Sequence, residues 1–186
     1  MTVHVSLLPG LPPYGPLPTA FPAEWGTSGR EGTVVEFVTE SGTWVANFKP
    51  GLAGIHMADV HPNGCDALVI ASGDLWVVNP VRKTAEYVLP AVDSAFEVQG
   101  PRGWVFTRQG IALVRLGPDG IRWHTRRLSW DGFDRLRIDS ERVSGFAWSL
   151  DSEWIPFEVE LATGRSTGGS FSDDDDDAEG WEQLAN

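Results

Sequence analysis

Cysteine is nearly absent from this chain of 186 residues, in which Cys65 is the only one. A single thiol excludes an intrachain disulfide and any zinc site built on several cysteines. No apolar run approaches the length of a membrane span. The start, MTVHVSLLPGLPPYGP, lacks the basic region of a secretory signal and is interrupted by prolines. These absences predict a cytoplasmic protein with no membrane partner.

Catalytic and cofactor-binding motifs are missing as well. The sequence has no Walker loop, nucleophile elbow, HExxH helix or dinucleotide fingerprint. His56, Asp59 and His61 are of metal-ligating types, but on a strand the side chains at 56 and 61 point to opposite faces because their separation is odd. We therefore predict no metal site, no cofactor, a turn-capping role for His61 and a structural or incidental role for Cys65.

Basic residues are scarce, with 14 lysines and arginines against 26 acids and a net charge of −12. The segment from Ser172 to Asn186 carries seven acids and no base, which leaves −5 for the rest. The window Pro101–Arg142 has the opposite balance, with nine arginines and five acids. An acidic chain with one basic band argues against general nucleic-acid binding, which needs a basic surface.

Helical periodicity is almost absent, and short β-branched and aromatic runs separated by Gly, Pro, Asn and Asp take its place. The runs form three sets of four predicted strands, which begin near Ile55, Ser94 and Asp134 at offsets of 39 and 40 residues. A fixed period with a four-strand unit is typical of propeller-like arrays. The predicted strands are 55–60, 66–72, 74–79, 84–89, 94–99, 102–108, 111–116, 121–128, 134–139, 142–149, 153–161 and 165–169.

A partial fourth unit precedes these sets, with strands at 33–40 and 43–49. The sequence thus predicts an all-β fold: an antiparallel meander of about 14 short strands in four-stranded repeats of about 40 residues. Its closure stays open between a propeller, a barrel and stacked sheets. Residues 1–30 are expected to form a proline-rich arm without regular strands, residues 31–171 a single all-β domain and residues 172–186 an acidic, disordered tail.

Three short segments carry a resemblance to a known repeat style. HPNG (61–64), DLWVVNP (74–80) and LGPDGIRW (116–123) resemble blade segments of β-propellers of the quinoprotein and TolB kinds. WHTRRLSWDG (123–132) and PFEVELATGRSTGGS (156–170) are similar to strings in a group of small uncharacterised bacterial proteins. The first resemblance implies a propeller-like fold, and the second implies no activity.

Nine tryptophans are the main compositional anomaly. Those inside predicted strands have apolar neighbours and are expected to fill the core: Trp44, Trp76, Trp104, Trp123 and Trp148. Trp130 and Trp154 are in or beside turns and are expected at the surface. Acidic residues lie among the tryptophans as in glycan-processing sites, but turn formation already explains several of them. These acids are Asp131, Asp134, Asp151, Glu153, Glu158 and Glu160.

The segment WHTRRLSWDGF, Trp123 to Phe133, combines arginine with tryptophan, the residue types that dominate interaction hot spots. In a strand over 121–128, Trp123 faces the core while a cationic stripe faces away from it. Such a stripe either protects an exposed edge strand or docks a carboxylate, a phosphate or an acidic protein. Our candidate binding residues are Arg122, His124, Arg126, Trp130, Asp131, Arg135 and Arg137.

These observations favour a non-catalytic, cytoplasmic protein-binding module, a scaffold or immunity-type factor, whose protein partner presents acidic groups. A glycan- or metabolite-active enzyme with tryptophan-lined carboxylates is the first alternative. Nucleic-acid binding through the arginine band is the second. The sequence does not specify an oligomeric state.

Overall fold

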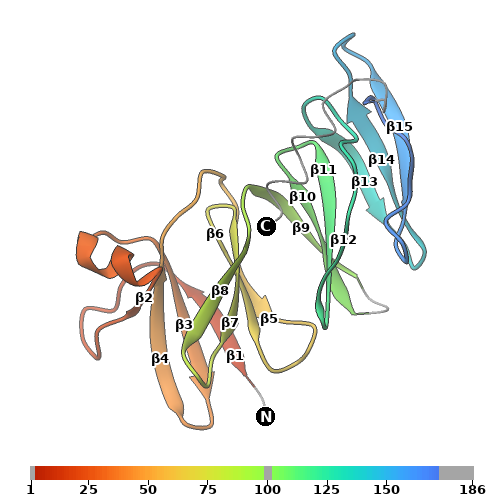
Figure 1. Cartoon of the computed structure of the whole chain (residues 1–186). Helices are drawn as coiled ribbons and strands as arrows, with labels where there is room; N and C mark the ends of the chain where they lie inside the picture. Colours follow the sequence, from red (N-terminus) through yellow and green to blue (C-terminus); the bar gives the residue numbers. More distant parts are fainter. Residues whose placement is uncertain (1–2, 99–101, 172–186) are drawn as a thin grey trace. The chain divides into compact units, whose positions relative to one another are not determined.

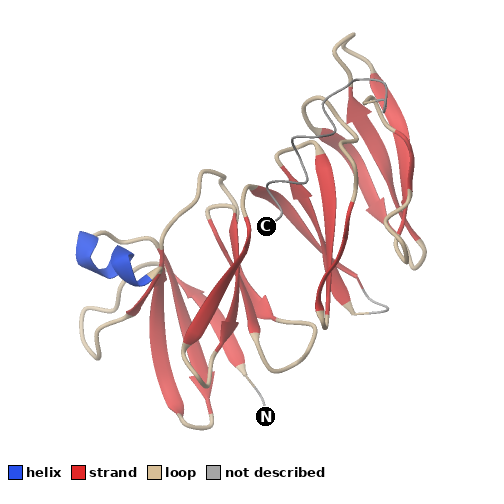
Figure 2. Cartoon of the chain, in the orientation of Figure 1, coloured by secondary structure: helices blue, strands red, loops and turns tan. Residues whose placement is uncertain are grey.

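The structure is a computed structural model that describes residues 3–98 and 102–171. Strands occur throughout these residues, and the helical element is one short 3-10 helix, η1 (Ala23–Ser28), as Figure 2 shows. No helix of the described ranges is long and apolar enough to cross a membrane. The predicted acidic tail at 172–186 lies outside the described residues.

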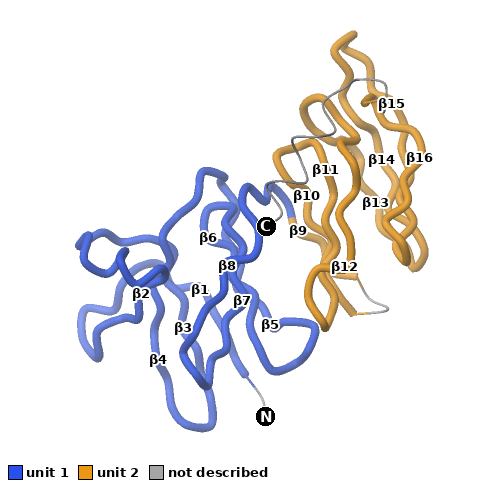
Figure 3. The backbone as a smooth tube through the Cα atoms, in the orientation of Figure 1, with its two compact units in different colours: residues 1–94 blue, residues 95–186 orange. Residues whose placement is uncertain are grey.

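The strands form four sheets of four strands each. Figure 1 labels β1 to β15, and Figure 3 also labels β16. In the order in which neighbouring strands pair, the first sheet is β1 (His4–Leu8), β3 (Thr33–Thr39), β4 (Gly42–Phe48) and β2 (Thr19–Phe21). The second is β5 (His56–Val60), β6 (Ala67–Ala71), β7 (Asp74–Asn79) and β8 (Thr84–Leu89). The third is β12 (Gly120–His124), β11 (Ala112–Gly117), β10 (Gly103–Arg108) and β9 (Val92–Val98). The fourth is β13 (Phe133–Ile138), β14 (Arg142–Trp148), β15 (Trp154–Glu160) and β16 (Ser166–Gly168).

The three predicted repeats are confirmed as the second, third and fourth sheets, each a meander of four strands consecutive in the chain. Turn chemistry sets their register. Ser72 and Gly73, at φ 49° and 90°, form the two-residue turn that pairs Ala71 with Asp74. Positive φ at both positions matches the right-handed twist of the joined strands. The fold is all-β, and its four-stranded repeats are propeller-like.

The expectation that residues 1–30 contain no regular strand is wrong. β1 pairs antiparallel with β3, and β2 pairs in parallel with β4, so the partial fourth unit is a full sheet. The reason is the placement of the prolines, because β1 contains none and β2 lies between Pro18 and Pro22 at a sheet edge. Proline is tolerated at an edge, where a missing donor breaks no ladder.

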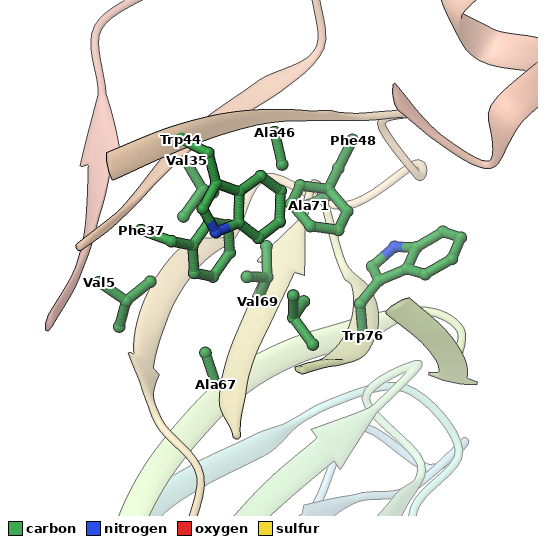
Figure 4. Packing of buried hydrophobic residues seen from close by; sticks show 11 residues of the cluster. Val5, Val35, Phe37, Trp44, Ala46, Phe48, Ala67, Val69, Ala71 and Trp76 are labelled. Carbon is green, nitrogen blue, oxygen red and sulfur yellow. The ribbon is translucent and has the colours of Figure 1, made fainter. Parts of the chain in front are cut away.

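The chain divides into two compact units, residues 1–94 and residues 95–186 (Figure 3). In the first unit the first two sheets enclose a core in which Trp44 stacks on Phe37 and Trp76 packs near Phe48 (Figure 4). In the second unit Leu113 and Trp123 of the third sheet belong to one buried cluster with residues of the fourth. The members from the fourth sheet and its turns are Val143, Ala147, Phe157, Val159 and Leu161.

Three of the five tryptophans expected in the core are buried: Trp44, Trp76 and Trp123. The expectation is wrong for Trp104 and Trp148, which are half-buried. Trp148 lies on β14 at a position that alternates with the buried Val143 and Ala147, so it points away from the cluster between the third and fourth sheets. Trp154 is 43% exposed, as expected of a surface residue.

Candidate functional site

Trp123 is buried as predicted, with 8% of its surface exposed, while Arg122 and His124 are exposed on the other face of β12. Its indole Nε1 donates a hydrogen bond to the Leu161 carbonyl oxygen at 2.9 Å, and the Arg115 guanidinium donates to the same oxygen. A Cβ atom at Gly164 would come within 2.7 Å of the ring, so only glycine lets the β15–β16 turn lie this close to the indole. Trp123 is thus a packing residue that fastens β12 to the fourth sheet.

The strand predicted over 121–128 ends at His124. The Leu113 amide donates to the Thr125 hydroxyl oxygen at 2.9 Å. In a regular β-ladder a backbone carbonyl oxygen would accept this hydrogen bond. Residues 125–128 still follow β11 through the bonds from Thr125 N to Leu113 O and from Leu128 N to Ile111 O, at 2.9 and 2.8 Å. Arg122 and His124 therefore lie on the exposed face of β12, whereas Arg126 is exposed, as predicted, but lies beyond the end of the strand.

Arg126 and Trp130 take part in anchoring the last described residues. The Arg126 guanidinium donates to the carbonyl oxygens of Gly168, at 3.1 Å, and of Phe171. The Arg127 guanidinium lies 4.6 Å from the Trp130 ring centroid and 4.5 Å from that of Phe171. Because cations are attracted to aromatic faces, this arrangement holds the segment after β16 against the β12–β13 connection. Asp131 is exposed in that connection.

The arginines of the 101–142 window do not form one continuous surface. Arg108 and Arg115 are buried, and Arg122 pairs with Asp119 at 3.4 Å. The His124 ring keeps an exposed part, yet its surroundings desolvate it and, together with the positive charge of Arg108, lower its pKa. The predicted stripe on β12 is therefore broken into residues with separate environments.

Arg135 and Arg137, by contrast, lie together on the face of the fourth sheet that points away from the third. This outer face follows the alternation of β14 and β15, whose buried residues occupy the other face. Its residues are Asp134, Arg135, Arg137, Arg142, Ser144, Phe146, Trp148, Trp154, Pro156, Glu158, Glu160 and Thr167.

A β-bulge in β13 places both arginines on this face. Asp134 pairs with Phe146 and Arg137 with Ser144, so two residues of β13 stand opposite the single Gly145. Arg135, one of these two, has φ 50° and lies 5.8 Å from the centroid of the Phe146 ring. A bulge redirects side chains at the cost of local strain. Without it, strict alternation would turn Arg137 toward the core.

A shallow groove of about 630 Å³ runs over the centre of the outer face. Its lining residues are Arg135, Arg137, Ser144, Gly145, Phe146, Pro156, Phe157, Glu158, Thr167 and Gly168. A second hollow of about 550 Å³ shares Glu158 and Thr167 with it and continues to Arg142 and Arg165. Arg142 and Glu158 form an ion pair at 2.6 Å between the two.

The outer face has an aromatic end and a charged end. Trp148 and Trp154 pack edge to face with their centroids 5.0 Å apart, and Phe146 lies opposite Pro156 on the next strand. Toward the other end, Arg137 and Arg165 are exposed and form no ion pair with any residue in the ranges 3–98 and 102–171. The face offers guanidinium groups for carboxylates beside apolar rings, and these chemistries suit an acidic peptide with an apolar side chain.

Of the seven candidate binding residues, the structure brings Arg135 and Arg137 into the groove and leaves the other five outside its lining. Sequence reasoning missed Arg142, Phe146 and Pro156 as parts of the same face. The alternation of polar and aromatic residues at 142, 144, 146 and 148 and at 154, 156 and 158 was the signal that could have found them.

His61 serves the HPNG turn, as predicted. Its Nδ1 accepts the Asn63 amide at 3.1 Å, and the Asn63 side chain in turn accepts the amides of Cys65 and Asp66 at 2.9 and 3.0 Å. Burial lowers the pKa of His61, against the raising effects of Asn63 and Asp66. No group of three or more His, Cys, Asp and Glu side chains within the described residues could hold a metal ion.

No protein-family model matches the chain, and no curated protein matches it. Among solved structures it is similar to the crystal structure of puromycin hydrolase, with 20% identity and a TM-score of 0.43. The similarity covers 74% of this chain and 24% of that one, so the chain spans about a quarter of that protein's length.

Proposed function

We propose that this protein is a non-catalytic binding module whose binding face is the outer face of the fourth sheet. Its partner is a protein segment that presents acidic side chains next to an apolar one. The observation that carries the proposal is the groove in which Arg135 and Arg137 lie beside Phe146 and Pro156. The single, exposed Cys65 supports a reducing, cytoplasmic setting for this module.

The chemistry of the groove favours carboxylates over other ligands. A guanidinium group binds a carboxylate through two parallel hydrogen bonds, and this geometry is both stronger and more selective than a contact with a point charge. Arginine and tryptophan are also enriched among the residues that dominate binding energy at interfaces. Arg137 has its charge available for such a contact, because no ion pair with another described residue neutralises it.

The dimensions of the face favour a short segment as the partner. Four strands span about 14 Å across, and the seven residues of β14 extend for about 23 Å. The resulting footprint, roughly 300 Å², is well below the ~800 Å² that each partner contributes to a standard interface. A peptide-sized ligand in extended conformation fits it.

Charge reversal tests the proposal with a defined probe, a fluorescein-labelled peptide in which aspartates flank one tryptophan. Arg137→Glu is expected to weaken binding of this peptide at least about tenfold, as measured by fluorescence anisotropy at low salt. Arg82→Glu is the matched control, since Arg82 is also exposed but lies in the β7–β8 turn of the other unit. If both variants lost the same affinity for the peptide, the effect would come from net charge alone. That result would refute the outer face of the fourth sheet as the binding face.

A further inference from the structure

We propose that the chain's own acidic segment, Ser172–Asn186, occupies the outer face of the fourth sheet and competes there with the acidic partner. The competition rests on the proposed function, whereas the docking of the segment stands by itself. Three features of the chain support this docking: the place where the described chain ends, the distance the segment must cover and the charge it meets.

The described chain ends at the end of the fourth sheet where Trp148 lies. The Gly169 amide donates to the Pro156 carbonyl oxygen at 3.0 Å, and the Ser170 hydroxyl donates to the carbonyl oxygen of Trp148. Arg126 and Arg127 then hold Phe171 in place through its carbonyl oxygen and its ring. Phe171 is therefore a fixed point at the Trp148 end of the fourth sheet, next to the β12–β13 connection.

The segment is long enough to reach the arginines. Arg137 pairs with Ser144, four residues along β14 from Trp148, and lies two strands away from β15. This amounts to about 17 Å from the point where the chain leaves the face. The acidic run Asp173–Asp177 begins two residues after Phe171 and ends six residues after it. A fully extended chain therefore lets Asp177 reach about 20 Å from Phe171, which is enough to cover the distance to Arg137.

The charges of the segment and the face are complementary. Residues 172–186 carry seven acids and no base. On the face, Asp134 and Glu158 already hold Arg135 and Arg142, at 3.3 and 2.6 Å. The attraction therefore comes from Arg137 and Arg165, which form no ion pair with another described residue. Because the segment is tethered, its effective concentration at the face reaches the millimolar range, so weak contacts suffice for occupancy.

Zero-length carbodiimide cross-linking of the full chain tests the docking. In an Arg137→Lys variant the charge is kept and an amine is supplied, so an amide bond forms only with a carboxylate in direct contact. Peptide mapping is expected to detect an amide bond between residue 137 and the run 173–177 of the same chain. The control variant Arg82→Lys is expected to form no cross-link to that run. The inference would be overturned if Arg137→Lys gave no cross-link to the run 173–177, or if Arg82→Lys gave the same yield of a cross-link to that run. It would also be overturned if the cross-links joined only two copies of the chain.

The competition is tested by replacing all five aspartates of the run 173–177 with asparagine in the full chain. Binding of the labelled acidic peptide is expected to tighten about fivefold at low salt, and the gain is expected to disappear at high salt because the contacts are exposed. An unchanged affinity in a chain that binds the peptide would overturn the competition. If the cross-link forms and the peptide binds neither chain, the proposed function fails while the docking of the segment stands.

Discussion

Replacing Trp123 with alanine should strongly destabilise the second unit. The indole is 8% exposed, packs within the cluster shared by the third and fourth sheets, and donates a hydrogen bond to Leu161. Emptying such a site costs about 3–5 kcal/mol. The Leu161 carbonyl keeps its bond from Arg115, so no buried acceptor is left without a donor. We therefore expect about 4 kcal/mol, the middle of that range.

The loss is measured by urea unfolding followed by far-UV circular dichroism, because removing a tryptophan would alter a fluorescence signal. With a slope of about 2 kcal/mol per molar urea, the midpoint should fall by about 2 M. Trp154→Ala is the matched control: Trp154 is 43% exposed, and its ring packs edge to face against Trp148. We expect it to cost about 1 kcal/mol.

The reverse ranking would refute the account of the fold around β12. If Trp123→Ala left the midpoint nearly unchanged while Trp154→Ala lowered it by about 2 M, the two faces of the third and fourth sheets would be misassigned. The outer face of the fourth sheet would then be part of the core, and the groove could not serve as a binding face.

The remaining predictions concern an anchor, a histidine and a strained turn. Arg126→Glu removes hydrogen bonds to two backbone carbonyls at the surface and should cost about 1 kcal/mol in urea unfolding, whereas no loss would mean that the segment after β16 is held by other contacts. The pKa of His61 is lowered in the folded chain, so the unfolded chain takes up the proton first and stability should fall as pH drops below about 6.5. His61→Asn keeps an acceptor for the Asn63 amide, and its free energy of unfolding should fall less between pH 7 and pH 5 than that of the wild-type chain. An equal fall in both chains would show that His61 is not the group responsible. Gln109→Gly relieves a φ of 53° and should raise the free energy of unfolding by about 0.5–1 kcal/mol, which thermal unfolding would detect as a higher Tm.

The repeats were predictable because their signals are local. Alternating apolar residues and turn residues such as Ser72 and Gly73 determine where strands begin and end, and the three complete units follow from them. β2 was missed because it pairs in parallel with β4 through a long-range contact that no local pattern encodes. A proline-rich composition indicates a lack of internal ladders, yet it leaves room for a short edge strand.

The candidate site was predicted only in part. Arg135 and Arg137 were identified from their residue type, but their position depends on a bulge, and bulges are set by pairing with a second strand. Arg126 is exposed as predicted, but β12 ends at His124, and the Arg126 guanidinium donates to the carbonyl oxygens of Gly168 and Phe171 outside the groove. Phe146 and Pro156 lie next to the arginines because of the register of β13, β14 and β15. A single sequence does not reveal that register.

A charge-swap measurement tests most directly whether the outer face of the fourth sheet binds acidic segments. Two labelled peptides that differ only in aspartate or lysine around one tryptophan are titrated against the wild-type chain and Arg137→Glu. The wild-type chain should prefer the acidic peptide, and the variant should lose or reverse that preference because the central charge of the groove has changed sign. An identical preference in both chains would contradict the claim that this face selects the partner.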